Sequence, residues 1–220
     1  CCYNPNWSNY NTAWPRNPES PMLNIKVRQA LNKALDRDVL QKAFAPAGEP
    51  MRVNHFRPEW PGWNPEWERR WNEMYGYDPA KARQLLAEAG MSPWQGPPVV
   101  INMVDVLQLS NTNDMAEAVG GYWRAIGVPV EFNAVDPATR QSQARAFRHF
   151  HHWAMTSTGS DQVYAAQVYN FGSTKIPSVT CYCPPQIVKV YDEELVPQMD
   201  PAKQGPVLRR LGDWMFENFA

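Results

Sequence analysis

The sequence predicts an α/β domain in which helices cover a largely parallel sheet. Between residues 99 and 157, segments typical of strands alternate with segments typical of helices, which is the pattern of a parallel sheet. Amphipathic helices are predicted on both sides of that region. A chain of 220 residues is also long enough to bury a substantial core.

The first helices are predicted within the stretch NIKVRQALNKALDRDVLQKAF, residues 24–44. Val27, Ala30 and Leu31 recur there at spacings of three and four, so they share one apolar face. A second short helix is predicted from Asp38. After a loop rich in proline, glycine and tryptophan at 45–64, the stretch NPEWERRW begins another helix.

The stretch YDPAKARQLLAEAG predicts a helix over residues 79–89. Asp78 is a suitable N-cap, and Pro79 takes the first helical position, where its missing N–H costs nothing. Gly90 can adopt the left-handed conformation that ends a helix. The apolar stripe of this helix consists of Ala82, Leu85, Leu86 and Ala89.

Three strands and several helices are predicted in the remainder. The strands lie near 99–105, 128–135 and 150–156, and the helices between them cover 111–126 and 137–147. The loop-rich residues 158–185 follow, and then two helices, PPQIVKVYDEEL and DPAKQGPVLRRLGDWMFENF. The last of these shows no C-cap, so it is expected to run to the end of the chain.

Composition excludes several classes of function. The net charge is −1, which gives no electrostatic reason to bind nucleic acid or an anionic membrane. No apolar run approaches the length of a membrane span. The enzyme motifs GxSxG, HExxH, GxxxxGK and GxGxxG are absent, so neither catalysis nor a cofactor is expected. The opening CCYNPNW lacks the regions of a signal peptide, so we expect a mature form or a fragment.

The order of three motifs resembles a known family. VRQALNKALDRDVL, then YDPAKARQLLAEAG, then a strand and WRAIGVPVEF are similar to the extracellular solute-binding proteins of ABC importers, in the dipeptide, oligopeptide and nickel class, family 5. The resemblance implies one lobe of a type II periplasmic-binding-protein fold, with a mixed sheet flanked by helices. It also implies export to the periplasm or the cell exterior, a small-molecule solute, an ABC permease as membrane partner, and a monomer.

The resemblance implies that the chain is the second lobe of a longer protein. We expect a hinge-proximal extended segment at 1–24, a helical and loop part at 25–98, the alternating part at 99–157, and loops with truncated C-terminal helices at 158–220. The ligand would bind between this lobe and the first. A free-standing glycan-binding module or a hydrolase accessory domain is the alternative.

The resemblance places the ligand site in the segment HHWAMTSTGSD. Trp153 falls on a family tryptophan, and Asp161 on the last acidic position of a loop that faces the cleft between the lobes. Thr156, Ser157 and Thr158 stand where an acid is expected to pair with a peptide amine. Hydroxyls beside an indole favour an oligosaccharide slightly ahead of a peptide. Alternatively, Trp153 belongs to the core and Asp161 caps a helix.

Four tryptophans between residues 60 and 71 have two interpretations. Trp60, Trp63, Trp67 and Trp71 could stack on a ligand, or their spacing could pack a loop and helix onto the body. Packing is the favoured interpretation, and Trp63 is retained as a candidate ligand contact.

The cysteines form two pairs at distant points of the chain. Cys1 and Cys2 are expected to form disulfides with Cys181 and Cys183 in an oxidising compartment, since adjacent cysteines bond each other only with strain. A four-thiolate metal site is the alternative, although CxxC spacing is absent. His149 and His151 would share one face of a strand and could hold a metal ion, whereas His152 would lie on the other face. No third ligand is evident, so no metal is predicted.

Overall fold

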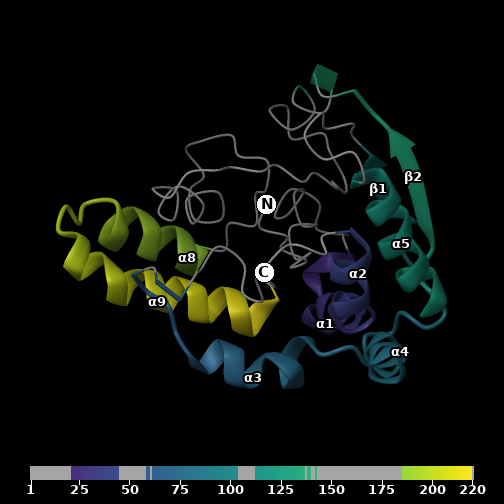
Figure 1. The fold of residues 1–220 in the computed structure, drawn as a ribbon, viewed down its shortest axis with the longest axis horizontal. Coiled ribbons are helices and arrows are strands. Elements are labelled where there is room, and N and C mark those ends of the chain that lie inside the picture. The colour runs from purple at the N-terminus through teal and green to yellow at the C-terminus, as the bar shows by residue number, and fades with distance from the viewer. Residues whose placement is uncertain are drawn as a thin grey trace.

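The computed structural model describes residues 21–44, 58–59, 61–103, 112–136, 138–139, 142 and 185–219. In Figure 1, α3, α8 and α9 gather at one end of the molecule, and α1, α2, α4, α5 and the two strands gather at the other. The helices are η2 (Pro21–Leu23), α1 (Ile25–Lys33), α2 (Arg37–Phe44), α3 (Glu66–Tyr75), α4 (Pro79–Glu88), α5 (Thr112–Ala125), α8 (Pro185–Lys189), the π-helix η3 (Val190–Leu195) and α9 (Pro201–Asn218); the strands are β1 (Val99–Met103) and β2 (Val130–Ala134).

The two strands form a parallel pair. Val99 lies opposite Val130 and Met103 opposite Ala134, and α5 connects the end of β1 to the start of β2. The structure therefore confirms that two of the three predicted strands share a sheet and that a helix crosses between them. The third predicted strand, 150–156, lies outside the described residues.

The local signals of α4 and α5 have the expected effect. The Asp78 carboxylate accepts a hydrogen bond from the backbone N–H of Lys81 at 2.8 Å, which satisfies an amide of the first turn. Gly90 and Gly127 follow α4 and α5 with φ of 72° and 93°, in the left-handed region that glycine adopts without strain.

Two predicted boundaries are corrected at the C-terminal end. The helix predicted over PPQIVKVYDEEL is a short α-helix that continues as the π-helix η3. The prediction that the last helix lacks a C-cap is wrong: Phe219 adopts the left-handed conformation, with φ of 54°, and its N–H bonds the Met215 carbonyl. This conformation is uncommon for a bulky side chain, but Phe219 is 1% exposed, so packing compensates for it.

The buried apolar residues form two clusters. We call the first the sheet core, because its members come from η2, α1, α2, α4, α5, both strands and the turns beside them. We call the second the helical core, because its members come from α3, α8, η3, α9 and the residue after it. The sheet core consists of Met22, Val27, Ala30, Leu31, Ala34, Leu35, Leu40, Ala82, Leu85, Leu86, Val99, Ile101, Met115, Ala116, Val119, Trp123, Ile126, Val128 and Val130; the helical core consists of Trp67, Trp71, Tyr75, Ile187, Leu195, Val207, Leu208, Leu211, Met215, Phe216 and Phe219.

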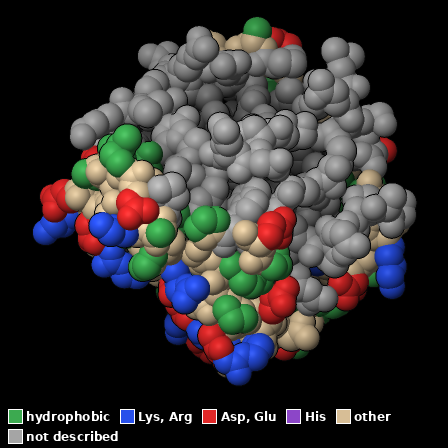
Figure 2. Space-filling model, turned by 60° about the vertical axis from the view of Figure 1, so that its left-hand side comes forward, with side chains coloured by type: hydrophobic (Ala, Val, Ile, Leu, Met, Phe, Trp, Pro, Cys, Tyr) green, Lys and Arg blue, Asp and Glu red, His purple; other side chains and the backbone are tan. Residues whose placement is uncertain are grey.

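The described surface is of mixed charge. Figure 2 shows Lys and Arg side chains interspersed with Asp and Glu, and with hydrophobic side chains, on the coloured part of one face. This agrees with the near balance of 21 basic and 22 acidic residues in the whole chain. Among the helices that the structure describes, none is long and apolar enough to cross a membrane.

Candidate functional site

Most residues of the predicted ligand site lie outside the described part of the chain. This applies to Trp153, Thr156, Ser157, Thr158 and Asp161, so their role stays a prediction. The four cysteines Cys1, Cys2, Cys181 and Cys183 and the histidines His149, His151 and His152 also lie outside it, as does Trp60. The candidate that can be examined is Trp63, in the turn that precedes α3.

Trp63 lies at the edge of the helical core. The turn before it uses Gly62 with φ of 88°. The half-buried Trp63 indole meets the Trp67 indole edge to face, with ring centroids 5.4 Å apart and planes at 88°. This is a favoured geometry for aromatic pairs. Its backbone carbonyl accepts a hydrogen bond from Nη2 of Arg209 at 2.8 Å. Trp67 therefore packs against the indole of Trp63, and Arg209 bonds the backbone of the same residue.

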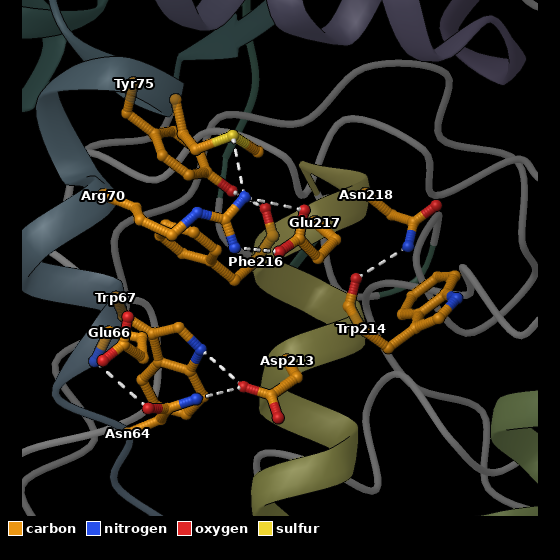
Figure 3. A network of polar contacts seen from close by, with 11 residues as sticks. Asn64, Glu66, Trp67, Arg70, Tyr75, Asp213, Trp214, Phe216, Glu217 and Asn218 are labelled. Atoms are coloured by element: carbon orange, nitrogen blue, oxygen red, sulfur yellow. Dashed lines mark hydrogen bonds and ion pairs between the residues drawn. The ribbon is translucent and has the colours of Figure 1, made fainter.

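Asp213 of α9 fixes the residues next to Trp63. One carboxylate oxygen, Oδ1, accepts a hydrogen bond from Nδ2 of Asn64 at 2.7 Å and another from Nε1 of Trp67 at 2.8 Å (Figure 3). Asn64 also accepts from the backbone N–H of Glu66 at 3.1 Å, which satisfies an amide at the start of α3. A single carboxylate thus sets where the turn ends and α3 begins.

A second set of contacts ties α3 to the last turn of α9. Arg70 forms an ion pair with Glu217, and its guanidinium lies 5.6 Å from the centroid of the Phe216 ring (Figure 3). The hydrogen bond to Glu217 raises the pKa of Arg70 above the ordinary value of an arginine. The hydroxyl of the buried Tyr75 donates to the Phe216 carbonyl at 2.7 Å. The two helices are therefore locked in register along their length.

These contacts pack α3 and the turn before it against α9. Trp67 and Trp71 are 1% and 5% exposed, and both belong to the helical core. The packing interpretation of that pair is thus confirmed, whereas ligand contact by Trp63 stays a prediction. Within the described ranges, no three His, Cys, Asp or Glu side chains cluster to hold a metal ion. No sequence signal singles out Asp213, because its partners Asn64 and Trp67 lie 149 and 146 residues away along the chain.

Comparison with known proteins places the chain among binding proteins. Residues 3–176 match the family model described as bacterial extracellular solute-binding proteins, family 5 middle. The heme-binding protein A of Haemophilus influenzae is 35% identical over 130 residues, which cover 57% of this chain and 22% of that protein. The dipeptide-binding protein of Escherichia coli is 32% identical over 112 residues, which cover 50% of this chain and 20% of that protein. The matches thus span about a fifth of these curated relatives.

Solved structures share the fold. HbpA2 from Haemophilus parasuis superposes with a TM-score of 0.75 at 22% identity, covering 93% of this chain and 39% of that one. A periplasmic oligopeptide-binding protein from Thermotoga maritima superposes with a TM-score of 0.73 at 15% identity, covering 94% of this chain and 41% of that one. The chain has the α/β fold of one lobe of a type II periplasmic binding protein, as the sequence predicts. Three of these four proteins are named for what they bind: heme, dipeptides and oligopeptides.

Proposed function

Since the chain belongs to the bacterial extracellular solute-binding proteins of family 5, we propose that it is the second lobe of the solute receptor of an ABC importer. The observation that carries this proposal is the family match over residues 3–176, joined to a lobe-like fold. In the complete protein, the solute would be held between two lobes, and the closed form would present it to a permease in the membrane. The receptor would work as a monomer in the periplasm or at the cell exterior.

Closure of two lobes explains how such a receptor signals its loaded state. A ligand that touches both lobes gains contacts only in the closed form, so it shifts the population toward closure. An isolated lobe supplies only part of these contacts. We therefore propose that the 220-residue chain binds the solute weakly or not at all, while the complete protein binds it tightly.

For the solute, we propose a peptide, with an oligosaccharide as the second candidate. The dipeptide-binding relative supports the peptide. The sequence supports the oligosaccharide, because Thr156, Ser157 and Thr158 offer hydroxyls beside Trp153, and the acid expected near Thr156 is absent. A peptide amine would then pair with Asp161 or with an acid of the other lobe. Trp63 would contribute an aromatic face that packs edge to face with Trp67, and Arg209 bonds the backbone carbonyl of Trp63.

A thermal-shift screen of the complete protein tests the ligand class. Di- to pentapeptides, neutral oligosaccharides and heme would be compared at the same concentrations, with an amino-acid mixture as a blank. A rise in the melting temperature with peptides supports the proposal, because a ligand that binds only the folded state stabilises it. A rise with sugars alone would establish the second candidate and reject the first.

Titration calorimetry with the best ligand then tests the site and the two-lobe requirement. Trp153→Ala should weaken binding by the complete protein at least tenfold, whereas Trp94→Ala, in the loop between α4 and β1, should not change it. Unchanged affinity in Trp153→Ala would show that the cleft is elsewhere. Tight binding by the 220-residue chain alone would contradict the two-lobe receptor.

A further inference from the structure

The two cores are connected by polar contacts. The sheet core and the helical core share no buried apolar residue within the described ranges. Between them lie three basic side chains, Arg28 and Lys33 on α1 and Arg37 at the start of α2. Each of the three donates a hydrogen bond to a backbone carbonyl of α3 or α9, the helices of the helical core.

The three carbonyls lie at the carboxyl ends of two helices. Nζ of Lys33 donates to the Glu73 carbonyl at 2.8 Å, and Nη1 of Arg37 to the Tyr75 carbonyl at 3.0 Å, both in the last turn of α3. Nε of Arg28 donates to the carbonyl of Asn218, the last residue of α9, at 2.9 Å. We call these three pairs the polar joint.

The chemistry of helix ends explains this choice of partners. The last carbonyls of a helix have no amide of their own helix to bond, and they carry the negative end of the helix dipole. A lysine or arginine satisfies both needs at once. The guanidinium of Arg37 also lies 5.6 Å from the Trp71 ring centroid and 5.8 Å from that of Tyr75, which adds cation–π attraction.

Each arginine is anchored firmly on the side of the sheet core. Nη1 of Arg28 donates to the carbonyls of Met22 and Leu23 at 2.7 and 3.1 Å. Arg37 donates from Nη2 to Oδ1 of Asn32 at 2.6 Å. If the cores separate, the cations therefore stay with the sheet core, and the helix ends leave.

The covalent connection across the joint is short. α3 ends at Tyr75 and α4 begins at Pro79, so only residues 76–78 join the helical core to the sheet core at this point. Asp78 is fixed to the sheet-core side, because its backbone N–H bonds the Lys33 carbonyl at 2.8 Å. Gly76 and Tyr77 remain as the residues whose backbone angles can change without breaking either core.

We propose that the polar joint is a hinge inside the lobe, at which the helical core swings as a unit against the sheet core. The swing exchanges cation–carbonyl hydrogen bonds for hydrogen bonds to water and leaves both sets of buried apolar residues packed. Polar interfaces between compact units permit such motion, whereas apolar ones resist it. The hinge is distinct from the closure of two lobes and does not depend on the identity of the solute.

Residual dipolar couplings of backbone amides test the hinge in the full 220-residue chain. If the two cores are rigid relative to each other, their couplings fit one alignment tensor. If the helical core swings, its couplings fit a separate tensor with a lower degree of order. Lys33→Met and Arg37→Met each remove one cation of the joint while retaining much of its apolar stem. We expect the helical core to lose order relative to the sheet core in both variants.

Hydrogen exchange in the same samples separates swinging from unfolding. The mid-helix amides of Leu86 in α4 and Leu211 in α9 should keep their wild-type exchange rates within about twofold, because a swing leaves each core packed. Faster exchange at Leu211 together with the loss of order would mean that the helical core unfolds, and it would overturn the proposal.

Lys26→Met is the matched control. Lys26 is also a cation of α1, but its partner is Glu88 of α4, with Nζ and Oε2 at 2.8 Å on the sheet-core side. This variant should keep the couplings of the wild type. One shared tensor of unchanged order in the wild type and in both joint variants would overturn the proposal. If Arg37→Met does not fold, Lys33→Met alone decides the outcome.

Discussion

The indole N–H of Trp123 donates a hydrogen bond to the backbone carbonyl of Leu31 at 3.1 Å, and the Trp123 side chain has no exposed surface. This contact joins α5, which crosses between the strands, to α1. The carbonyl of Leu31 lies near the carboxyl end of α1, where acceptors need donors from outside the helix. Trp123 therefore fills the sheet core and satisfies one of its polar groups.

Trp123→Phe should lower the free energy of unfolding by about 2–4 kcal/mol, since a buried hydrogen bond is lost and a small cavity is created. Urea unfolding measures the change. Trp94→Phe is the control: its indole N–H bonds the Pro97 carbonyl at 2.9 Å in an exposed setting, so water can replace the partner. Equal losses in the two variants would contradict the structural role of Trp123.

Asp213→Ala should destabilise the protein by about 1–3 kcal/mol, because the N–H of Trp67 loses its acceptor inside a side chain that is 1% exposed. Asp213→Asn keeps an oxygen that can accept, and it should lose less. Glu193→Ala, at an exposed site on η3, should change stability by less than about 0.5 kcal/mol. Thermal unfolding of the three variants tests this order of stability losses. An Asp213→Ala variant as stable as the wild type would contradict it.

Two adjacent glycines in α5 should respond in opposite ways to alanine. A Cβ on Gly120 would lie 2.5 Å from Cζ of Phe132 and 3.2 Å from Cγ1 of Val130, whereas a Cβ on Gly121 would have no neighbour within 4 Å. Gly121→Ala should stabilise the protein by about 0.5–1 kcal/mol through helix propensity. Gly120→Ala should destabilise it by about 1–3 kcal/mol despite the same gain, because α5 is forced off the sheet. Denaturant titrations that move both variants in the same direction would contradict this packing.

The ion pair between Lys26 and Glu88 should affect how the free energy of unfolding depends on pH in the acid range. The hydrogen bond from Lys26 holds the pKa of Glu88 below its ordinary value of 4.5. A carboxyl whose folded pKa is lowered contributes stability above its unfolded pKa, and it loses that contribution as pH falls through the folded value. An NMR titration should therefore show a higher pKa for Glu88 in Lys26→Met than in the wild type. The same pKa in both would mean that the pair does not persist in solution.

Local signals in the sequence predicted the elements whose boundaries depend on near neighbours. Asp78, Pro79 and Gly90 delimit α4 through contacts within one turn, and the predicted 79–89 differs from the observed helix by a single residue. The same kind of signal predicts a strand over 99–105, and the structure describes it over Val99–Met103. In both cases the residues that favour the helix or strand lie within that element or directly beside it, so a single sequence is enough to predict it.

Long-range polar contacts gave no such signal. Arg28, Lys33 and Arg37 look like ordinary basic residues of an amphipathic segment, because the helix ends that they bond lie between 38 and 190 residues away. The left-handed Phe219 was missed for a related reason. Packing, rather than intrinsic preference, fixes its backbone, and packing is invisible in a single sequence.

Parallel pairing of β1 and β2 has a consequence for protein engineering. The chain leaves both strands at the same edge of the sheet, into residues 104–111 after β1 and residues 135–142 after β2. Segments that follow the carboxyl ends of parallel strands can vary while the scaffold beneath them stays packed. A library confined to these two stretches of sequence would change the residues that follow both strands and leave every described residue of both cores as it is. The scaffold and the part open to redesign thus occupy separate stretches of sequence.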